Sequence, residues 1–170
     1  MEATGAKLVR AGYTLVSGNA PGADQAWARG GNAADPTRVE LCLPWESFEA
    51  TAIHGRNVVR VLGSDVVDQQ KYVLRVQETH PTFARLTAGA LRLHARNAMI
   101  VEGAHLVLGA LNPGKPGGGG TASAFRIAQR QGICTLNVAD SLVRKMIDAR
   151  LENGEDPRGK VYDTTGVKRW

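Results

Sequence analysis

Four consecutive glycines stand between a segment with the pattern of a strand and a segment with the pattern of a helix. The run "HLVLGA" at 105–110 is short and apolar, and 121–131 shows helical spacing. Glycines leave backbone N–H groups free to point at one ligand, and a helix amino end adds partial positive charge. This order predicts a phosphate site, with a flexible loop and an ordinary helix cap as the alternative. Its residues are Gly117, Gly118, Gly119, Gly120 and Thr121, the last placed at the start of the helix.

The net charge of +5 is concentrated around this loop. Between Glu78 and Asp140 the only acid is Glu102. The same stretch holds six bases, Arg85, Arg92, Arg96, Lys115, Arg126 and Arg130. The whole excess therefore lies beside the glycines. This favours an anionic partner, either a nucleotide or a nucleic acid, with a solvated basic face as the alternative.

Strands and helices alternate along the chain. Strands are expected at 13–17, 39–44, 105–110 and 133–138. Helices are expected at 2–11, from Pro21, over 64–101 with a break at 79–81, over 121–131 and over 141–152. The alternation predicts an α/β fold with helices on both faces of a mostly parallel sheet. The length of 170 residues suits one domain with a real core.

A second candidate site segment is "SGNAPGAD", which follows the first expected strand. Carboxyl ends of parallel strands share one edge, so this turn is expected to face the same crevice as the glycines. Ser17, Gly18, Asn19 and Asp24 are the candidates for holding a sugar or a base. For Asp24, a negative charge that complements the dipole of the next helix is the alternative.

A third candidate segment is "LHARNAMIVEGA", at 93–104. Arg96 offers a planar fork of donors suited to phosphate, and Arg85, Arg92 and Arg96 share a stripe of the expected helix. Asn97 falls on the apolar stripe, so it is predicted to be buried and to need hydrogen-bond partners.

Several classes of protein are not indicated. The four histidines show no spacing typical of a metal site, and no cofactor is predicted. Cys42 and Cys134 fall in apolar runs, which predicts buried thiols in a reducing compartment. The sequence shows neither an apolar span of membrane length nor a leader pattern. We therefore expect a cytoplasmic location and no membrane partner.

Taken together, "LVSGNAPGAD", "RNAMIVEGA" and "PGGGGTASAF" resemble, in order and spacing, the SLOG superfamily. The superfamily includes the Lonely-guy phosphoribohydrolases and the DNA-processing A proteins. The resemblance covers about residues 3 to 140 and implies a Rossmann-like three-layer domain that binds a nucleotide or a nucleotide-derived ligand. Residues 1–140 are then the SLOG-like nucleotide-binding domain. Residues 141–170 are a C-terminal helix and polar tail packed on that domain or on a partner.

The resemblance leaves open whether the ligand is cleaved. In Lonely-guy enzymes an Arg in an R-K-x-x-M-type helix and a Glu after P-G-G-x-G-T cleave the bond between base and ribose. Arg96 is similar to the first, but Ala122, Ser123 and Ala124 follow the glycine loop, with no Glu. A glycosidase would therefore need another carboxylate, for which Asp24 and Glu102 are the candidates. We expect a sensor or sequestering module, with the phosphoribohydrolase as the alternative.

Two further expectations come from the resemblance. "RNAMI" with "GGTASA" is also similar to segments of DNA-processing proteins, so single-stranded DNA binding is a third alternative. The family begins with a strand before its first helix, whereas this sequence starts at "MEATGAKL", within that helix. The resemblance implies that the sheet is completed by the tail or by another subunit, which predicts a homo-oligomer or strand exchange.

Overall fold

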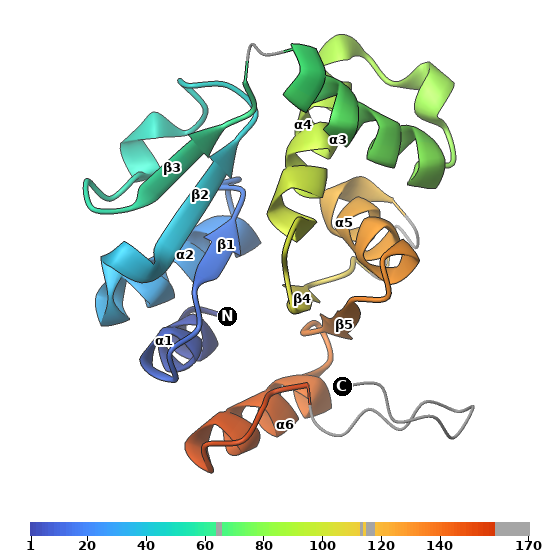
Figure 1. Cartoon of the computed structure of the whole chain (residues 1–170). Coiled ribbons are helices and arrows are strands. Elements are labelled where there is room, and N and C mark those ends of the chain that lie inside the picture. The colour runs from blue at the N-terminus through green and yellow to red at the C-terminus, as the bar shows by residue number, and fades with distance from the viewer. Residues whose placement is uncertain (64–65, 113, 115–117, 159–170) are drawn as a thin grey trace.

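The computed structural model describes residues 1–63, 66–112, 114 and 118–158 (Figure 1). These residues form an α/β fold. The α-helices are α1 (Glu2–Arg10), α2 (Ala23–Ala34), α3 (Val66–Thr79), α4 (Ala88–Val101), α5 (Gly119–Arg130) and α6 (Ser141–Glu152). The strands are β1 (Leu15–Ser17), β2 (Val39–Leu43), β3 (Val58–Val61), β4 (Leu106–Gly109) and β5 (Cys134–Asn137). Short 3₁₀ helices lie at Pro36–Arg38, Ala50–Ala52 and Phe83–Arg85.

The strands form two parallel sheets. One has the order β1-β2-β3, with Leu15 opposite Val39 and Glu40 opposite Val58. The other pairs β4 with β5, and its register begins with Leu106 opposite Cys134. β1 is paired only with β2, and β4 is paired only with β5, among the described residues. No hydrogen bond between described residues joins β1 to β4.

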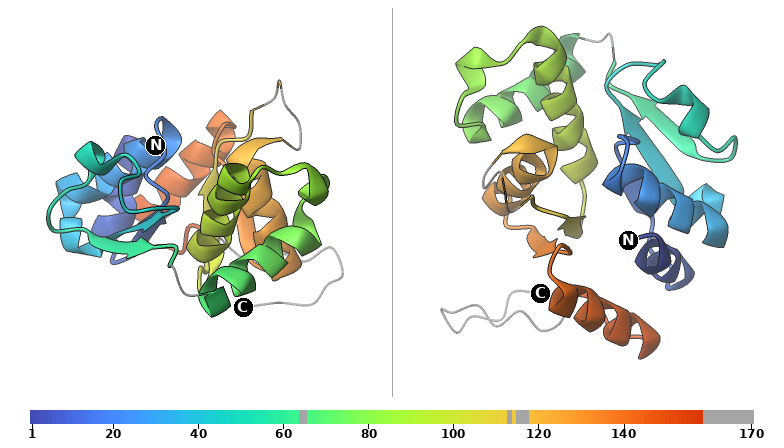
Figure 2. Two further views of the ribbon diagram at one scale, coloured as in Figure 1. Left: turned by 90° about the horizontal axis from the view of Figure 1, so that it is seen from above. Right: turned by 180° about the vertical axis from the view of Figure 1, so that it is seen from behind.

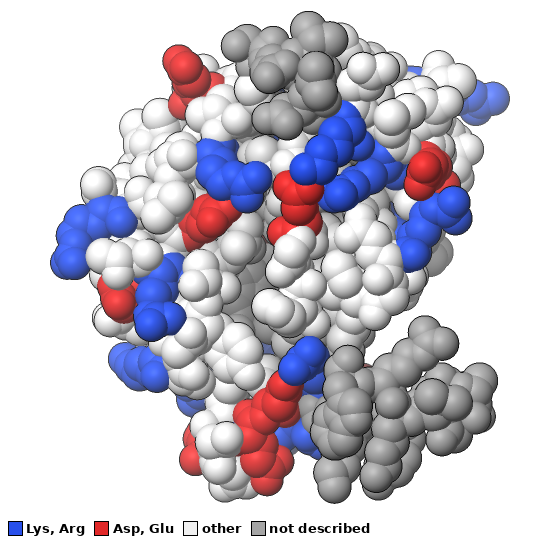
Figure 3. Space-filling model, in the orientation of Figure 1, with Lys and Arg blue, Asp and Glu red and all other residues white. Residues whose placement is uncertain are grey.

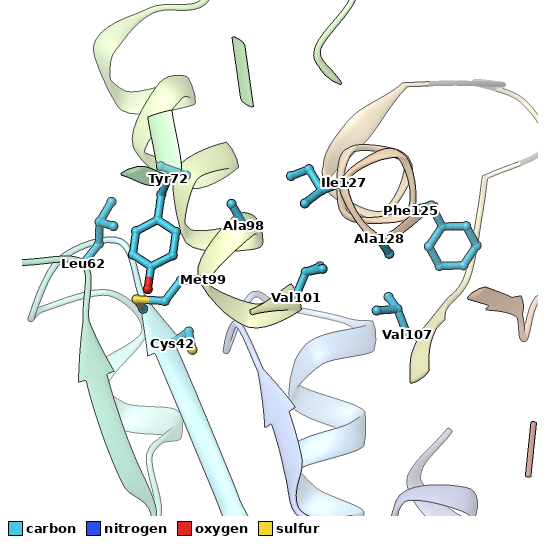
Figure 4. Packing of buried hydrophobic residues seen from close by; sticks show 11 residues of the cluster. Cys42, Leu62, Tyr72, Ala98, Met99, Val101, Val107, Phe125, Ile127 and Ala128 are labelled. Atoms are coloured by element: carbon cyan, nitrogen blue, oxygen red, sulfur yellow. The ribbon is translucent and has the colours of Figure 1, made fainter. Parts of the chain in front are cut away.

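The helices cover the strands on two sides, which gives the expected three layers (Figure 2). α1, α2 and α6 lie on one side, where Leu15 of β1 and Leu108 of β4 enter the same apolar cluster. α3, α4 and α5 lie on the other, where Val107 of β4 belongs to a second cluster (Figure 4) and Val16 of β1 packs against it. Both sheets therefore share both cores and behave as two halves of one layer.

The Rossmann-like α/β class predicted from the sequence is confirmed, but one strand was missed. β3 (Val58–Val61) lies at the edge of its sheet with Val58 and Val59 half exposed. An edge strand that buries little shows no alternation of apolar and polar residues, so its pairing with β2 decides its structure. The β-branched run "NVVRV" was the available signal.

The starts of three helices also differ from the predictions. α5 begins at Gly119, two residues before Thr121, so Gly119 and Gly120 belong to the first turn of the helix. α2 begins at Ala23, after a turn in which Gly22 has a φ of 97°. α4 begins at Ala88, so Arg85 lies in a 3₁₀ turn and not on the helical stripe with Arg92 and Arg96.

None of the described helices has both the length and the apolar character needed to cross a bilayer.

Candidate functional site

The junction between β1 and α2 is held by its own hydrogen bonds. Ser17 Oγ donates to the carbonyl of Asp24 at 3.1 Å, and Gln25 Nε2 donates to the carbonyl of Asn19 at 3.2 Å. Asn19 adopts a left-handed conformation with a φ of 58° and is fully buried. Its Nδ2 donates to the carbonyl of Glu49 at 3.0 Å, and its Oδ1 has no partner among the described residues. The predicted residues at this junction are therefore fixed in place.

Arg96 of α4 reaches this junction from the opposite helix layer. Its Nη1 donates to Asp24 Oδ2 at 3.0 Å, and its guanidinium lies 5.7 Å from the centre of the Phe48 ring. A Cβ at Gly18 would lie 1.1 Å from this same nitrogen, so the guanidinium passes directly over glycine backbone. Arg96 is only 5% exposed, yet its Nε has no described partner. A guanidinium can donate further charge-assisted hydrogen bonds from such an unused donor.

The junction between β4 and α5 is built differently. Gly118 precedes the helix and offers no side-chain cap, and Gly119 has a φ of 83°, which favours glycine. Gly118, Gly119 and Gly120 are exposed. Asn97, which is 7% exposed, donates from Nδ2 to the carbonyl of Gly120 at 3.1 Å. The burial and the partner predicted for Asn97 are confirmed, and Gly118, the N-cap of α5, makes no side-chain capping bond.

Close packing brings the two junctions onto one cavity of about 800 Å³. A Cβ at Gly109 would lie 2.4 Å from Thr121 Cγ2, so the start of α5 sits directly against the end of β4. The predicted residues that line the cavity are Ser17, Gly18, Asp24, Arg96, Asn97, Glu102, Gly120 and Thr121. Asn19 is buried beside them, and Gly117 lies outside the described residues.

Glu102 sits in an ion-pair cluster beyond the end of α4. Tyr72 donates to its Oε2 at 2.6 Å, Lys71 and Arg75 contact Oε1, and Arg60 lies 3.7 Å from Oε2. Burial alone would raise the pKa of Glu102, but the hydrogen bonds from Lys71 and Tyr72 outweigh it and lower the pKa. A carboxylate so fully engaged, six residues past Arg96 and so about 9 Å along the helix, is a poor base for water.

The remaining reactive groups show no sign of a second chemical site. Cys42 and Cys134 are free, and burial raises the pKa of the Cys42 thiol to about 12. Burial, with smaller effects from His80 and Arg126, lowers the pKa of His94 to about 4. Among the described residues, no three His, Cys, Asp or Glu side chains lie close enough to hold a metal ion.

The expected basic stripe on α4 is not an open surface. Arg92 donates from Nε to the carbonyl of Pro44 at 3.1 Å, and Arg96 is buried against Asp24. On the face shown in Figure 3, Lys and Arg alternate with Asp and Glu and do not form one basic area. The concentration of bases in this part of the sequence therefore does not become a basic helix face.

Sequence reasoning missed the contribution of the loop after β2. Phe48 packs under the guanidinium of Arg96, and the carbonyl of Glu49 fixes Asn19. Glu49 itself has a left-handed φ of 49°. Both contacts join segments about 30 to 50 residues apart, and nothing in the local pattern of "WESFEA" indicates them.

Fold and cavity together define a Rossmann-like α/β protein with a crevice at the carboxyl ends of its parallel strands. Comparisons with known proteins add no relative. No protein-family model matches the sequence, and no curated protein and no solved structure matches it.

Proposed function

We propose that this protein binds a nucleotide or a nucleotide-derived ligand, with its phosphate held between Arg96 and the amino end of α5. The observation that carries the proposal is the state of Arg96. Its buried guanidinium donates to Asp24, has no partner for Nε among the described residues, and lines the same cavity as Gly120 and Thr121. A phosphate there would satisfy the guanidinium and the uncapped N–H groups at once.

The two junctions have separate roles in this proposal. The glycines of α5 offer backbone N–H groups, which suit phosphate of any source. The β1–α2 junction offers side-chain and backbone groups of fixed position, which suit the hydroxyl and amide pattern of a sugar or base. The similarity to SLOG motifs noted above agrees with this division, and we propose membership of that superfamily on the same residues.

We favour binding over cleavage. Cleavage of an N-glycosidic bond develops positive charge on the sugar, which a free carboxylate stabilises. The positions after the glycines hold Ala122, Ser123 and Ala124. Asp24 is paired with Arg96 and also accepts from the N–H of Ala20 at 3.3 Å, while Glu102 is held in its own cluster. Neither carboxylate faces the cavity without a partner.

The phosphoribohydrolase remains the second candidate because both candidate carboxylates, Asp24 and Glu102, line the cavity. Single-stranded DNA binding is less favoured, because Arg92 and Arg96 are engaged within the protein. If it occurred through surface phosphates, its affinity would fall steeply with salt.

The test is native mass spectrometry with a nucleotide panel, with free base measured in the same mixtures. We expect intact nucleotide to be retained by the wild-type protein and lost in Arg96→Gln. Arg130→Gln is the matched control, since it removes the same charge from an exposed pair with Glu78. Released base would establish a glycosidase instead. Retention of neither nucleotide nor base, with binding of an oligonucleotide, would overturn the proposal.

A further inference from the structure

The cavity continues from the proposed phosphate site into the space between the two sheets, which we call the slot. It is lined by every residue from 12 to 18 and from 102 to 110, which includes the whole of β1 and β4. No hydrogen bond between described residues joins β1 to β4. One edge of each strand therefore faces the slot without a partner strand among the described residues.

The pairing of β4 with β5 shows which backbone groups of β4 face the slot. The carbonyl of Gly109 accepts from the N–H of Val138, so the backbone of Gly109 faces β5. The N–H and C=O groups of successive strand residues point to alternate sides. Val107 therefore also faces β5, whereas Leu106 and Leu108 each direct an N–H and a C=O into the slot.

The same reasoning applies to β1. The carbonyl of Leu43 accepts from the N–H of Leu62, so Leu43 of β2 faces β3 and Glu40 faces β1. Glu40 lies opposite Val16. In a parallel ladder a residue bonds the two neighbours of the residue opposite, and the opposite residue itself faces away. Val16 therefore directs its N–H and C=O into the slot.

The slot is apolar above and below the plane of the sheets. Leu15 and Leu108 pack against the cluster on the side of α1. Val107 belongs to the cluster on the side of α4, and Val16 packs against that cluster. A group lying in this plane would meet apolar side chains on both faces and polar backbone groups along its edges. A nucleobase has this form, because its faces are apolar and its edges carry donors and acceptors.

We propose that the slot holds the purine base of the ligand, in the plane of the two sheets. The inference rests on the proposed function, with the phosphate on Arg96 and the sugar at the β1–α2 junction. The cavity of about 800 Å³ is continuous from Arg96 and Gly120 to both strands, and its size is within the range of about 300–1,000 Å³ of small-molecule sites.

A purine suits the slot better than a pyrimidine because both walls offer backbone groups. A purine carries hydrogen-bonding atoms on opposite edges, N7 with the substituent at position 6 on one and N3 on the other. A pyrimidine presents only carbon on the edge opposite its base-pairing edge. The N–H and C=O of one strand residue lie side by side and complement the adjacent donor and acceptor on such a base.

Isothermal titration with three probes tests the base separately from the phosphate. The probes are a purine nucleotide (adenosine or guanosine 5′-monophosphate), uridine 5′-monophosphate and ribose 5-phosphate. We expect one of the purine nucleotides to bind the wild type about a hundredfold more tightly than ribose 5-phosphate and about tenfold more tightly than the uridine nucleotide.

Leu108→Pro removes one N–H that faces the slot and leaves the N–H groups of Val107 and Gly109 for β5. Val59→Pro is the matched control, because Leu62 faces β2 and the alternation turns the N–H of Val59 outward at the edge of the sheet. Leu108→Pro should lower purine nucleotide affinity about tenfold and leave ribose 5-phosphate affinity unchanged. Val59→Pro should change neither affinity, and Arg96→Gln should lower both.

Amide exchange of the wild type, followed by NMR, gives a second test that needs no variant. The amides of Val16, Leu106 and Leu108 should exchange about tenfold more slowly with the purine nucleotide than with ribose 5-phosphate. The amides of Val107 and Gly109 are bonded to β5 and serve as the reference. Unequal slowing of these two sets supports the inference even if Leu108→Pro does not fold.

Each other outcome overturns the inference in a distinguishable way. Equal binding of nucleotides and ribose 5-phosphate removes the base from the slot and leaves the phosphate site in place. Equal binding of purine and pyrimidine nucleotides removes the purine assignment. Failure of all three probes to bind overturns the proposed function itself. Slot amides already protected without ligand would show that polypeptide fills the slot, from a second copy if dilution removes the protection.

Discussion

The two junctions that meet at the cavity differ in whether their polar groups are already hydrogen-bonded within the protein. At the β1–α2 junction, Ser17, Asn19 and Asp24 all bond to nearby backbone, and Asp24 also holds Arg96. At the β4–α5 junction, the helix starts on glycines with no side-chain cap. The first junction uses its polar groups to hold itself and one arginine in place. The second has no side chain of its own that bonds the first N–H groups of α5. The two junctions together therefore combine a fixed positive charge, on Arg96, with backbone donors at the start of a helix.

Under the proposed function, damage to the first junction would act on nucleotide binding through the position of Arg96, whereas damage to the second would act on nucleotide binding directly. α4 links the two, because neighbouring residues on it, Arg96 and Asn97, reach one junction each. Substitutions can therefore separate loss of fold from loss of binding.

The largest effect is expected from Gly18→Ala. The new Cβ would lie 1.1 Å from Arg96 Nη1 and 2.7 Å from Asp24 Oδ2, so the guanidinium must move. We expect nucleotide affinity to fall about a hundredfold and unfolding free energy to fall by about 1–3 kcal/mol. Isothermal titration and urea unfolding measure the two.

Gly89→Ala is the control for that prediction, since a Cβ at Gly89 meets nothing within 4 Å and the residue is helical. It should leave affinity unchanged and raise stability by about 0.5–1 kcal/mol. Wild-type affinity in Gly18→Ala would show that Arg96 does not hold the ligand.

The open junction is tested by Gly120→Asp. Gly120 is the second residue of α5, and Gly89 is the second residue of α4, so Gly89→Asp is a control at the same helical position. Both acids complement a helix dipole by about 0.3–1 kcal/mol, so neither should unfold the protein. Only the acid at Gly120 faces the cavity, where it should weaken nucleotide binding about thirtyfold or more. Equal nucleotide affinities in the two variants would show that the phosphate does not bind at the amino end of α5.

The junctions also show what the sequence could and could not predict. The burial of Asn97 followed from its place on an apolar stripe, and the order of strand, glycines and helix placed Gly120 and Thr121 at the cavity. The pairing of Arg96 with Asp24 joins positions 72 residues apart. No local periodicity encodes such a contact, because it arises only when the sheet brings α2 and α4 together.

We expect α4, which links the two junctions, to be destabilised by acid through His94. Burial, followed by the charges of His80, Arg126 and Arg96, lowers the pKa of His94 on α4 to about 4. Its Nδ1 is buried without a described partner, and its ring lies 4.5 Å from that of His80. The unfolded chain binds this proton near pH 6.5 and the folded chain does not. Stability is therefore full above that pH and should fall by about 2 kcal/mol between pH 7 and pH 5.

His94→Leu should flatten this dependence, as thermal unfolding across the same pH range would show. If α4 links the junctions, nucleotide binding and stability should fall together in the wild type and neither should change steeply in the variant. An unchanged pH dependence in His94→Leu would place the responsible proton elsewhere.

The smallest change in nucleotide affinity is expected from Asp24→Asn. The direction of that change shows whether Asp24 only pairs with Arg96 or acts in glycosidic cleavage. Asparagine keeps the shape and the oxygen but removes the charge that partly neutralises Arg96. Because the Asp24 side chain is 34% exposed, the pair contributes about 1 kcal/mol or less to stability. A free positive charge attracts phosphate more strongly, so a binding module should gain a few-fold in nucleotide affinity. A glycosidase that uses Asp24 should instead keep its affinity and lose base release. A large loss of nucleotide affinity would show that Asp24 is needed to hold Arg96 in the position that binds phosphate.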